Sequence, residues 1–298
     1  MKYGVHRLTW GNLFDPDNLG LFFQQAKATG ASTVEFRPPD PALNGDDRKT
    51  AEIRKMAEDA GIEMLFCYGY PAGLDMRSEN PFTRQYAVEH LKRAVVAASK
   101  LGGTEIGGVL YSTWPPDYIG DRITPQVKYE RTQRSIECMR QVMPVAQNYN
   151  IQLNLEVLNR FENYIINTIE EGLSYISQVE SDHCGLVLDI FHMNMEEDDL
   201  EGAIRSARGH IGQVHVTEPN RRIPFHNRRI NWPLIGRTLK AIGYDGTVTM
   251  EAVMAFDDDA SYNLRMWRNQ MEDTSLEARI AAMKQGIIFL KEQFEDQG

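Results

Sequence analysis

The chain has 298 residues, of which 42% are hydrophobic and 25% are charged, so it carries enough apolar material for a globular core. Its net charge of −10 disfavours a phosphodiester backbone or an anionic lipid surface as a partner, and no nucleic-acid ligand is expected. The sequence contains no run of about 18 apolar residues, so no segment is predicted to span a membrane.

The three cysteines, Cys67, Cys138 and Cys184, lie far apart and form neither a CxxC pair nor a disulfide framework. We interpret them as core thiols in a reducing compartment. The amino-terminal run lacks the charged-then-apolar layout of a signal peptide. Together these features predict a cytoplasmic location.

Strand-like and helical segments alternate along the whole chain. Strands are predicted at 3–9, 32–37, 62–68, 104–110, 151–157, 184–190, 211–216 and 247–252. Helical periodicity occurs at 19–29, 48–60, 83–101, 126–148, 169–179, 200–207, 232–242 and in a long terminal run, 261–293. This order predicts a parallel sheet, and eight repeats favour its closure into a (β/α)8 TIM barrel.

An open doubly wound sheet is the alternative, but no GxGxxG motif follows the first predicted strand. Barrels of about 250 residues typically form one domain. We therefore expect residues 1–298 to form a single (β/α)8 barrel domain with an extended carboxy-terminal helical segment.

Four side chains of the kind that bind metals stand at or near predicted strand ends: Glu156, Asp189, His215 and Glu251. Their spacing of about 26 to 36 residues is close to the length of one βα unit. Because the carboxyl ends of barrel strands converge on one mouth, these side chains are predicted to meet there. Each one alone is equally compatible with a helix cap, an arginine pair or a core hydrogen bond, but the four together favour a metal site.

Three carboxylates and one imidazole form a mostly hard ligand set, which suits Mn²⁺, Mg²⁺ or Co²⁺ better than the thiolate sites of structural zinc. Octahedral coordination would leave two positions for adjacent oxygens of a polyhydroxy ketone or aldose. Such a cation polarises a carbonyl group and makes the neighbouring C–H bond acidic. The ligand set therefore predicts proton transfer beside a carbonyl group.

Three runs around these positions form a recognisable pattern: LEVLNRFENY at 155–164, LDIFHMNMEE at 188–197 and HVTEPNRR at 215–222. The runs YSTWP at 111–115 and MWR at 266–268 extend it. The pattern resembles the ketose 3-epimerases, the D-tagatose and D-psicose 3-epimerase family of xylose-isomerase-like TIM barrels. The resemblance implies epimerisation at C3 of a free ketohexose or ketopentose.

The resemblance further implies that Glu156, Asp189, His215 and Glu251 hold a divalent cation, Mn²⁺ in the first place and Co²⁺ or Mg²⁺ otherwise. It also assigns Glu156 and Glu251 as the acid/base pair, one on each face of C3. One would remove the C3 proton and the other would return it from the opposite side, through a cis-enediolate. A homodimer or homotetramer is the assembly that the resemblance implies.

Contacts to the ketose are assigned in the same way. Glu162, His192 and Arg221 match the positions that contact the C1–C3 end of the sugar. Trp114 is a further candidate, although a strand-end tryptophan equally often packs at the rim. His6 stands where the family has an aromatic residue beside the far end of the substrate, so it is a departure.

Two other features are open to more than one interpretation. Glu35, at the end of the second predicted strand, either orients a metal ligand or pairs with an arginine such as Arg37, and the ion pair is favoured. The family's Pro-Gly-x-Gly turn is replaced at 224–229, where the chain reads PFHNRR. The four arginines of 221–229 either contact a phosphate or form a solvated face or subunit contact, which is favoured.

Several alternatives to a free-ketose 3-epimerase remain open at this point. They are an aldose–ketose isomerase using the same metal, an epimerase of a ketose phosphate, a metal-dependent endonuclease for abasic DNA and a non-catalytic sugar-binding barrel. The endonuclease is disfavoured by the acidic balance and by a total of only seven histidines. The regiochemistry of hydrogen transfer separates the epimerase from the isomerase.

Overall fold

A closed barrel of eight parallel strands forms the centre of the computed structural model, which describes residues 1–298 except 72, 116, 118–119, 226–228 and 296–298. Each strand pairs with the next in chain order, and β8 pairs with β1. The strands are β1 (Lys2–His6), β2 (Thr33–Phe36), β3 (Glu63–Tyr70), β4 (Glu105–Thr113), β5 (Gln152–Glu156), β6 (Cys184–Asp189), β7 (Ile211–Val216) and β8 (Thr247–Met250).

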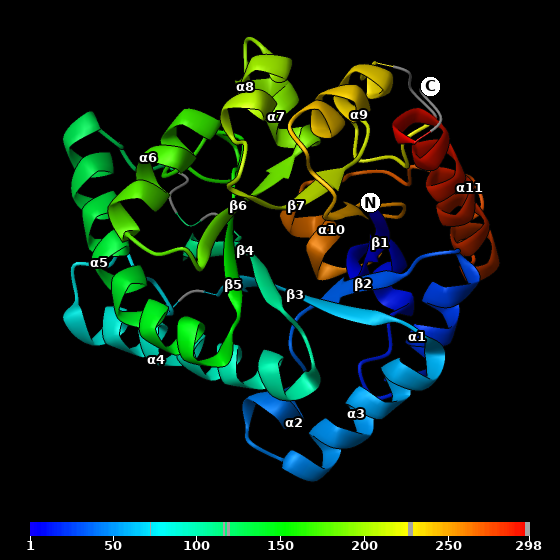
Figure 1. The fold of residues 1–298 in the computed structure, drawn as a ribbon, viewed down its shortest axis with the longest axis horizontal. Coiled ribbons are helices and arrows are strands. Elements are labelled where there is room, and N and C mark those ends of the chain that lie inside the picture. The colour runs from blue at the N-terminus through cyan, green and yellow to red at the C-terminus, as the bar shows by residue number, and fades with distance from the viewer. Residues whose placement is uncertain (72, 116, 118–119, 226–228, 296–298) are drawn as a thin grey trace.

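Helices surround the barrel on the outside (Figure 1). They are η1 (Arg7–Leu13), α1 (Leu19–Ala28), α2 (Asp40–Leu43), α3 (Asp47–Ala60), α4 (Pro81–Leu101), α5 (Pro125–Tyr149), α6 (Ile169–Val179), α7 (Ile190–Glu196), α8 (Leu200–Ser206), α9 (Trp232–Ala241), α10 (Asp259–Asn263) and α11 (Leu276–Phe294). The predicted (β/α)8 TIM barrel is confirmed. Within the described part of the chain, no helix has both the length and the apolar character needed to cross a membrane.

Two predicted elements differ from the structure for local reasons. The first strand ends at His6, because its side chain accepts a hydrogen bond from the Leu8 N–H and starts the 3-10 turn η1. The terminal helical run is interrupted, because α10 ends at Asn263 and Arg265 adopts a left-handed conformation with φ 57°. The single long run predicted from 261 is therefore wrong, and α11 begins only at Leu276.

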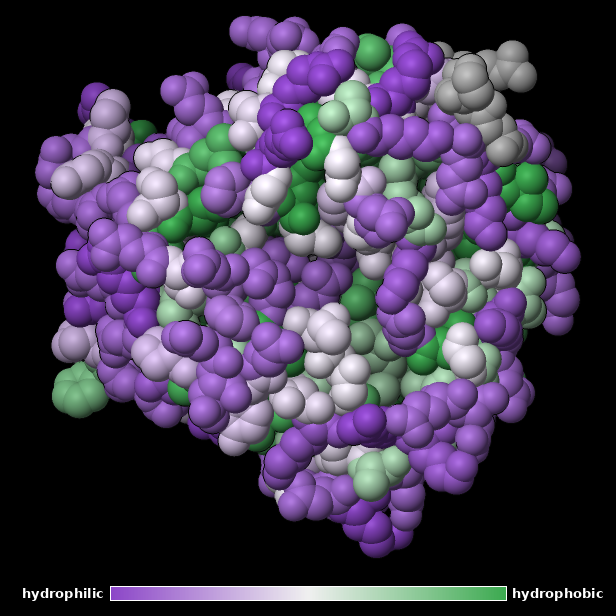
Figure 2. Space-filling model, in the orientation of Figure 1, coloured by the Kyte–Doolittle hydropathy of each residue, from purple (hydrophilic) through white to green (hydrophobic). Residues whose placement is uncertain are grey.

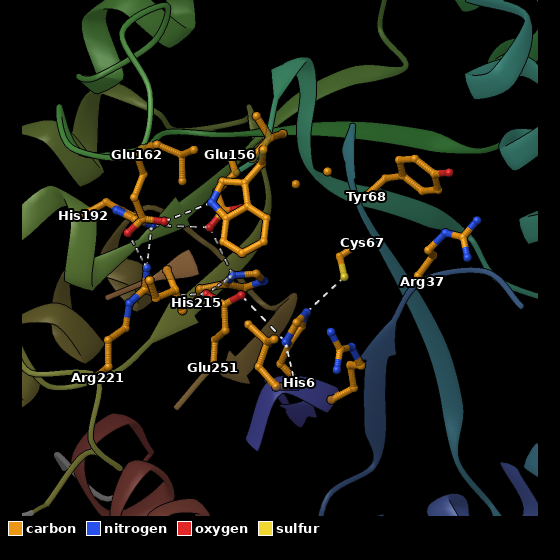
Figure 3. Close-up of a pocket in the computed structure, with 18 residues that line it drawn as sticks. His6, Arg37, Cys67, Tyr68, Glu156, Glu162, His192, His215, Arg221 and Glu251 are labelled. Carbon is orange, nitrogen blue, oxygen red and sulfur yellow. Dashed lines mark hydrogen bonds and ion pairs between the residues drawn. The ribbon is translucent and has the colours of Figure 1, made fainter. Parts of the chain in front are cut away.

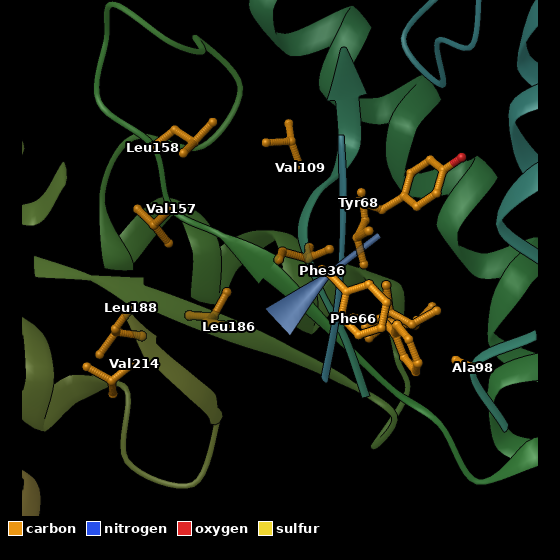
Figure 4. Close-up of a cluster of buried hydrophobic side chains, with 14 of the residues drawn as sticks. Phe36, Phe66, Tyr68, Ala98, Val109, Val157, Leu158, Leu186, Leu188 and Val214 are labelled. Carbon is orange, nitrogen blue, oxygen red and sulfur yellow. The ribbon is translucent and has the colours of Figure 1, made fainter. Parts of the chain in front are cut away.

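The hydrophobic core lies between the strands and the helical ring (Figure 4). All six residues of β6 are buried, as is typical of a parallel strand that is covered on both faces. Phe36 and Phe66 pack with ring centroids 5.5 Å apart and ring planes tilted by 53°, and neither residue is exposed by more than 2%. Burial of each such side chain stabilises the fold by about 1.5–3 kcal/mol. Most of the surface visible in Figure 2 is hydrophilic.

Candidate active site

The four predicted metal ligands meet at the carboxyl ends of four successive strands. Glu156 ends β5, Asp189 ends β6, His215 is the penultimate residue of β7, and Glu251 follows β8. One ligand atom from each lies within 4.8 Å of the others. All four side chains are buried, with Glu251 the most exposed at only 8%. The structure therefore brings together the set that the spacing predicted.

The neighbours of His215 and Asp189 leave one atom of each facing the cluster. His215 Nε2 lies 2.9 Å from Glu35 Oε2, so the ring donates there and presents Nδ1 to the cluster. Asp189 Oδ1 accepts a hydrogen bond from the Phe191 N–H over 2.8 Å, as the N-cap of α7. Among the described residues, His215 Nδ1 and Asp189 Oδ2 have no hydrogen-bond partner. Buried polar atoms of this kind are costly unless a ligand satisfies them, so they fit a divalent cation with N and O ligands.

The two glutamates of the cluster have opposite proton affinities. Burial, together with the negative charge of Glu251, raises the pKa of Glu156 to about 7. Burial would also raise the pKa of Glu251, but the neighbouring His215, His6 and Arg221 side chains hold this pKa below its usual value. Two carboxyl groups whose pKa values are pushed apart are the arrangement expected of an acid and a base.

Protons and a cation compete for this cluster. Burial opposes the charged imidazole, yet the Glu35, Glu156 and Glu251 carboxylates raise the pKa of His215 well above its usual value. A proton on Nδ1 therefore offsets part of the negative charge of the carboxylates when no cation is bound. Because a metal ligand must lose its proton, the affinity of the cluster for a cation is expected to rise with pH.

Arg221 links the cluster to the neighbouring polar wall of the cavity. Its guanidinium donates to Glu162 Oε1 over 2.8 Å and to Glu251 Oε2 over 3.2 Å, and it stacks on the Phe191 ring at 3.8 Å. Trp114 Nε1 donates to the other oxygen of Glu162 over 3.2 Å. Arg221 adopts φ 61°, an uncommon conformation for a non-glycine residue that often marks a functional site.

His192 points one ring nitrogen into the cavity. Its Nδ1 accepts a hydrogen bond from the Asn159 N–H over 3.1 Å, so the neutral ring carries its proton on Nε2. Nε2 lies 3.4 Å from Asp189 Oδ2 and 3.4 Å from the Arg221 guanidinium. Burial lowers the pKa of His192, which keeps the ring neutral and able to donate a hydrogen bond to a sugar oxygen.

A cavity of about 210 Å³ opens in front of the cluster. Figure 3 shows Glu162, His192 and Arg221 on one side of it, and Tyr68 and Arg37 on the other. All the predicted contact residues line this cavity, His6 and Trp114 included: Glu162, His192, Arg221, Trp114 and His6.

The structure corrects two interpretations made from the sequence, those of Glu35 and Cys67. It describes three of the four arginines of 221–229. Glu35 does not pair with Arg37, which donates to Asp40 Oδ1 instead, because Glu35 points into the barrel toward His215. Cys67 is not a core thiol, since it lines the cavity. Of the arginines of 221–229, Arg221 is buried and Arg222 bonds Gln270, Arg229 is exposed, and Arg228 lies outside the described residues.

Four further polar side chains line the cavity and were not predicted from the sequence to lie there: Arg7, Arg37, Cys67 and Tyr68. They follow or belong to β1, β2 and β3. The rule that identified the metal ligands, a chemically active side chain at the carboxyl end of a strand, applies equally to these three strands.

This protein belongs to the class of (β/α)8 barrels, and it carries a carboxylate–histidine cluster at the carboxyl ends of its strands. Residues 23–282 match the Xylose isomerase-like TIM barrel family. The D-psicose 3-epimerase of Ruminiclostridium cellulolyticum is 35% identical over 269 residues, which cover 90% of this chain and 89% of that relative. The L-ribulose 3-epimerase of Mesorhizobium japonicum is 29% identical, with coverage of 94% and 91%.

The solved structures agree with these relatives. A crystal structure of D-psicose 3-epimerase with D-tagatose, from Clostridium cellulolyticum, matches with a TM-score of 0.92 at 32% identity. The match covers 99% of this chain and 100% of the other. The chain therefore belongs to the ketose 3-epimerase family of the xylose isomerase-like TIM barrels.

Proposed function

We propose that this protein is a metal-dependent isomerase that epimerises a free ketose at C3. The observation that carries the proposal is the pair Glu156 and Glu251, whose nearest oxygens each lie 3.6 Å from His215 Nδ1. They come from β5 and from the end of β8, so they reach the cavity from well-separated strands of the barrel. Relatives named as D-psicose and L-ribulose 3-epimerases support a ketose as the substrate.

Different residues of this chain have different roles in the proposed reaction. One glutamate of the pair removes the C3 proton, and the other returns a proton to the opposite face of the planar enediolate, which inverts C3. The His192 Nε2–H and the Arg221 guanidinium supply hydrogen bonds to the sugar oxygens next to the reacting carbon. Glu162 holds Arg221 in place, and Trp114 holds Glu162.

Glu156, Asp189, His215 and Glu251 would hold the divalent cation, which polarises the substrate carbonyl and makes the neighbouring C–H bond acidic. We propose Mn²⁺, with Co²⁺ or Mg²⁺ as alternatives, because oxygen donors predominate in the set. A homodimer or homotetramer in the cytoplasm completes the proposal. Free cysteines support a reducing compartment, and the half-exposed aromatic contact between Phe256 and Tyr262 supports a subunit interface.

An epimerase of a ketose phosphate is the second candidate, and one observation favours it. Arg7 and Arg37 both line the cavity, and Figure 3 places Arg37 on the side opposite to Arg221. Arg37 already pairs with Asp40, whereas Arg7 makes no ion pair with a described residue and lies 5.6 Å from the Phe14 ring. A guanidinium that lines the cavity suits a substrate with a terminal anionic group.

The test is to incubate the Mn²⁺-loaded protein in D2O with free and phosphorylated ketoses and to follow label and product by NMR. Deuterium at C3 of an inverted free ketose is expected. Label at C1 or C2 with an aldose product would overturn the epimerase in favour of an isomerase, and turnover of phosphates alone would overturn the free-ketose assignment. Glu156→Gln and Glu251→Gln should each abolish turnover, and near-normal rates in either would contradict the two-base mechanism.

A further inference from the structure

A second cluster of metal-type side chains lies beside the first one and consists of His6, Glu35 and Cys67. His6 ends β1, Glu35 lies in β2, and Cys67 lies in β3, so three adjacent strands supply them. His6 Nε2 is 3.0 Å from Cys67 Sγ, and one ligand atom from each of the three lies within 4.8 Å of the others. The proton transfers proposed above use neither His6 nor Cys67.

Glu35 provides an independent indication that this cluster binds a ligand. Its side chain is completely buried, and Oε2 accepts hydrogen bonds from His215 Nε2 and Gln213 Nε2. Oε1 has no hydrogen-bond partner among the described residues. A buried carboxylate oxygen without a donor is destabilising, so it is expected to have a ligand.

We propose that His6, Glu35 and Cys67 form a second cation site, distinct from the Glu156 cluster, that binds a thiophilic divalent cation of the Zn²⁺ class. One nitrogen, one oxygen and one sulfur are the donors that zinc takes, and three protein ligands leave a fourth position open. Cys67 and His6 line the cavity, so this open position faces the space where a sugar would lie.

The charges of the site balance when the cation binds. The Cys67 thiol releases its proton to solvent and becomes a thiolate, which together with the Glu35 carboxylate neutralises a divalent cation, while His6 stays neutral. The two ligand sets differ in the cation that they favour. The Glu156 cluster has no sulfur, so Mn²⁺ or Mg²⁺ prefers it, and the thiolate directs zinc to the second site.

Binding at the second site requires a tautomer change in His6. The Leu8 N–H donates to His6 Nδ1 over 3.2 Å, so the neutral ring carries its proton on Nε2, facing Cys67. A cation on Nε2 moves that proton to Nδ1, at the cost of the Leu8 bond, and Glu251 Oε1 lies 3.7 Å away as its acceptor. Histidine ligands commonly donate their second N–H to a carboxylate in this way. Glu251 therefore connects the two sites.

The experiment titrates metal-free, full-length protein with Co²⁺ and follows its absorption spectrum and its stoichiometry by equilibrium dialysis. Wild type is expected to bind two Co²⁺ per chain and to show a sulfur-to-cobalt charge-transfer band in the near ultraviolet. Cys67→Ala should bind one Co²⁺ without the band, and Asp189→Asn should bind one with the band. The matched control Cys184→Ala, which changes a buried thiol outside the site, should behave as wild type.

A wild type that lacks the band, or a band that persists in Cys67→Ala, would overturn the proposal, whereas a wild type that binds a single Co²⁺ with the band would instead contradict cation binding at the Glu156 cluster. A second measurement does not depend on the fold of the Cys67 variant: Zn²⁺ should protect Cys67 of Asp189→Asn from alkylation by iodoacetamide, and unchanged alkylation would overturn the site. Both experiments measure metal binding rather than turnover. Their outcome is therefore independent of whether the protein epimerises ketoses.

Discussion

His215 donates its Nε2–H to Glu35 Oε2 over 2.9 Å, in a place where neither side chain is exposed by more than 1%. This bond orients the imidazole so that Nδ1 faces Glu156 and Glu251. Such an outer partner typically contributes roughly 10- to 100-fold to metal affinity. We therefore expect Glu35→Gln to weaken Mn²⁺ binding at the Glu156 cluster by roughly that factor, as measured by calorimetric titration.

The matched control for this prediction is Arg37→Ala. Its guanidinium is the partner that the sequence suggested for Glu35, but in the structure it bonds Asp40. Arg37→Ala should leave Mn²⁺ affinity at the Glu156 cluster unchanged. Equal loss in both variants would mean that Glu35 acts through an arginine and not through His215.

Asp189→Asn should abolish turnover while stabilising the metal-free protein. An asparagine oxygen keeps the N-cap bond to the Phe191 N–H, so α7 is expected to remain folded. The substitution removes one of three buried carboxylates, which repel one another when no cation is present. The midpoint of thermal unfolding in EDTA should rise by a few degrees relative to wild type. Addition of Mn²⁺ should raise the midpoint in wild type far more than in the variant.

A destabilised Asp189→Asn protein in EDTA would show that the carboxylate serves the fold rather than a cation. The corresponding change at an exposed helix cap, Asp199→Asn, provides the comparison, since Asp199 also caps a helix, α8, but lies outside the cavity. It should change neither turnover nor the response to Mn²⁺.

The Glu156 cluster could be predicted from the sequence because the regular βα repeat determines where its residues lie. Each βα unit returns the chain to the same mouth of the barrel, so Glu156, Asp189, His215 and Glu251 had to converge there. All strand ends lie within three residues of the prediction, and the largest differences are at β1, where His6 starts η1, and at β4, which continues to Thr113.

The pairing of Glu35 with His215 could not be predicted in this way. β2 and β7 are not neighbours in the barrel, and the two residues are 180 positions apart in sequence, so their contact depends on side chains that cross the interior. Cys67 was wrongly assigned to the core because the sequence does not fix which face of β3 its side chain lies on. Adjacent residues of a strand point to opposite faces, and an error of one residue would exchange core for cavity.

Arg221→Lys is expected to lower kcat/KM by roughly 100-fold, although the charge is kept. A lysine ammonium cannot span Glu162 and Glu251 as the planar guanidinium does, and it loses the stacking on Phe191 at 3.8 Å. Steady-state kinetics on the best ketose provide the measurement. The neighbouring Arg222→Lys, whose parent side chain bonds Gln270 outside the cavity, is the control and should retain most of the activity. Equal losses in both variants would contradict a specific role of Arg221.

The stability of the protein should also depend on pH through Glu105, at the start of β4. Burial and the negative charge of Glu35 raise the pKa of this carboxyl to about 7, despite the hydrogen bond from Asn154 Nδ2 at 2.9 Å. The folded-state pKa is therefore higher than the value of 4.5 in an unfolded chain. The stabilisation is fully present below pH 4.5 and is lost as the pH rises through about 7.

Glu105→Gln, which is neutral at every pH, should remove this dependence. In urea unfolding with EDTA, the variant and wild type are expected to be similar at pH 5, and the variant should be more stable at pH 8 by about 2 kcal/mol, a figure reduced from the full linkage because Glu105 is only half-buried. EDTA is present in both samples, so titration of the Glu156 cluster cancels in the difference. The exposed Glu292→Gln is the matched control and should show no such divergence. A constant difference between Glu105→Gln and wild type from pH 5 to pH 8 would show that Glu105 is already ionised at the lower pH.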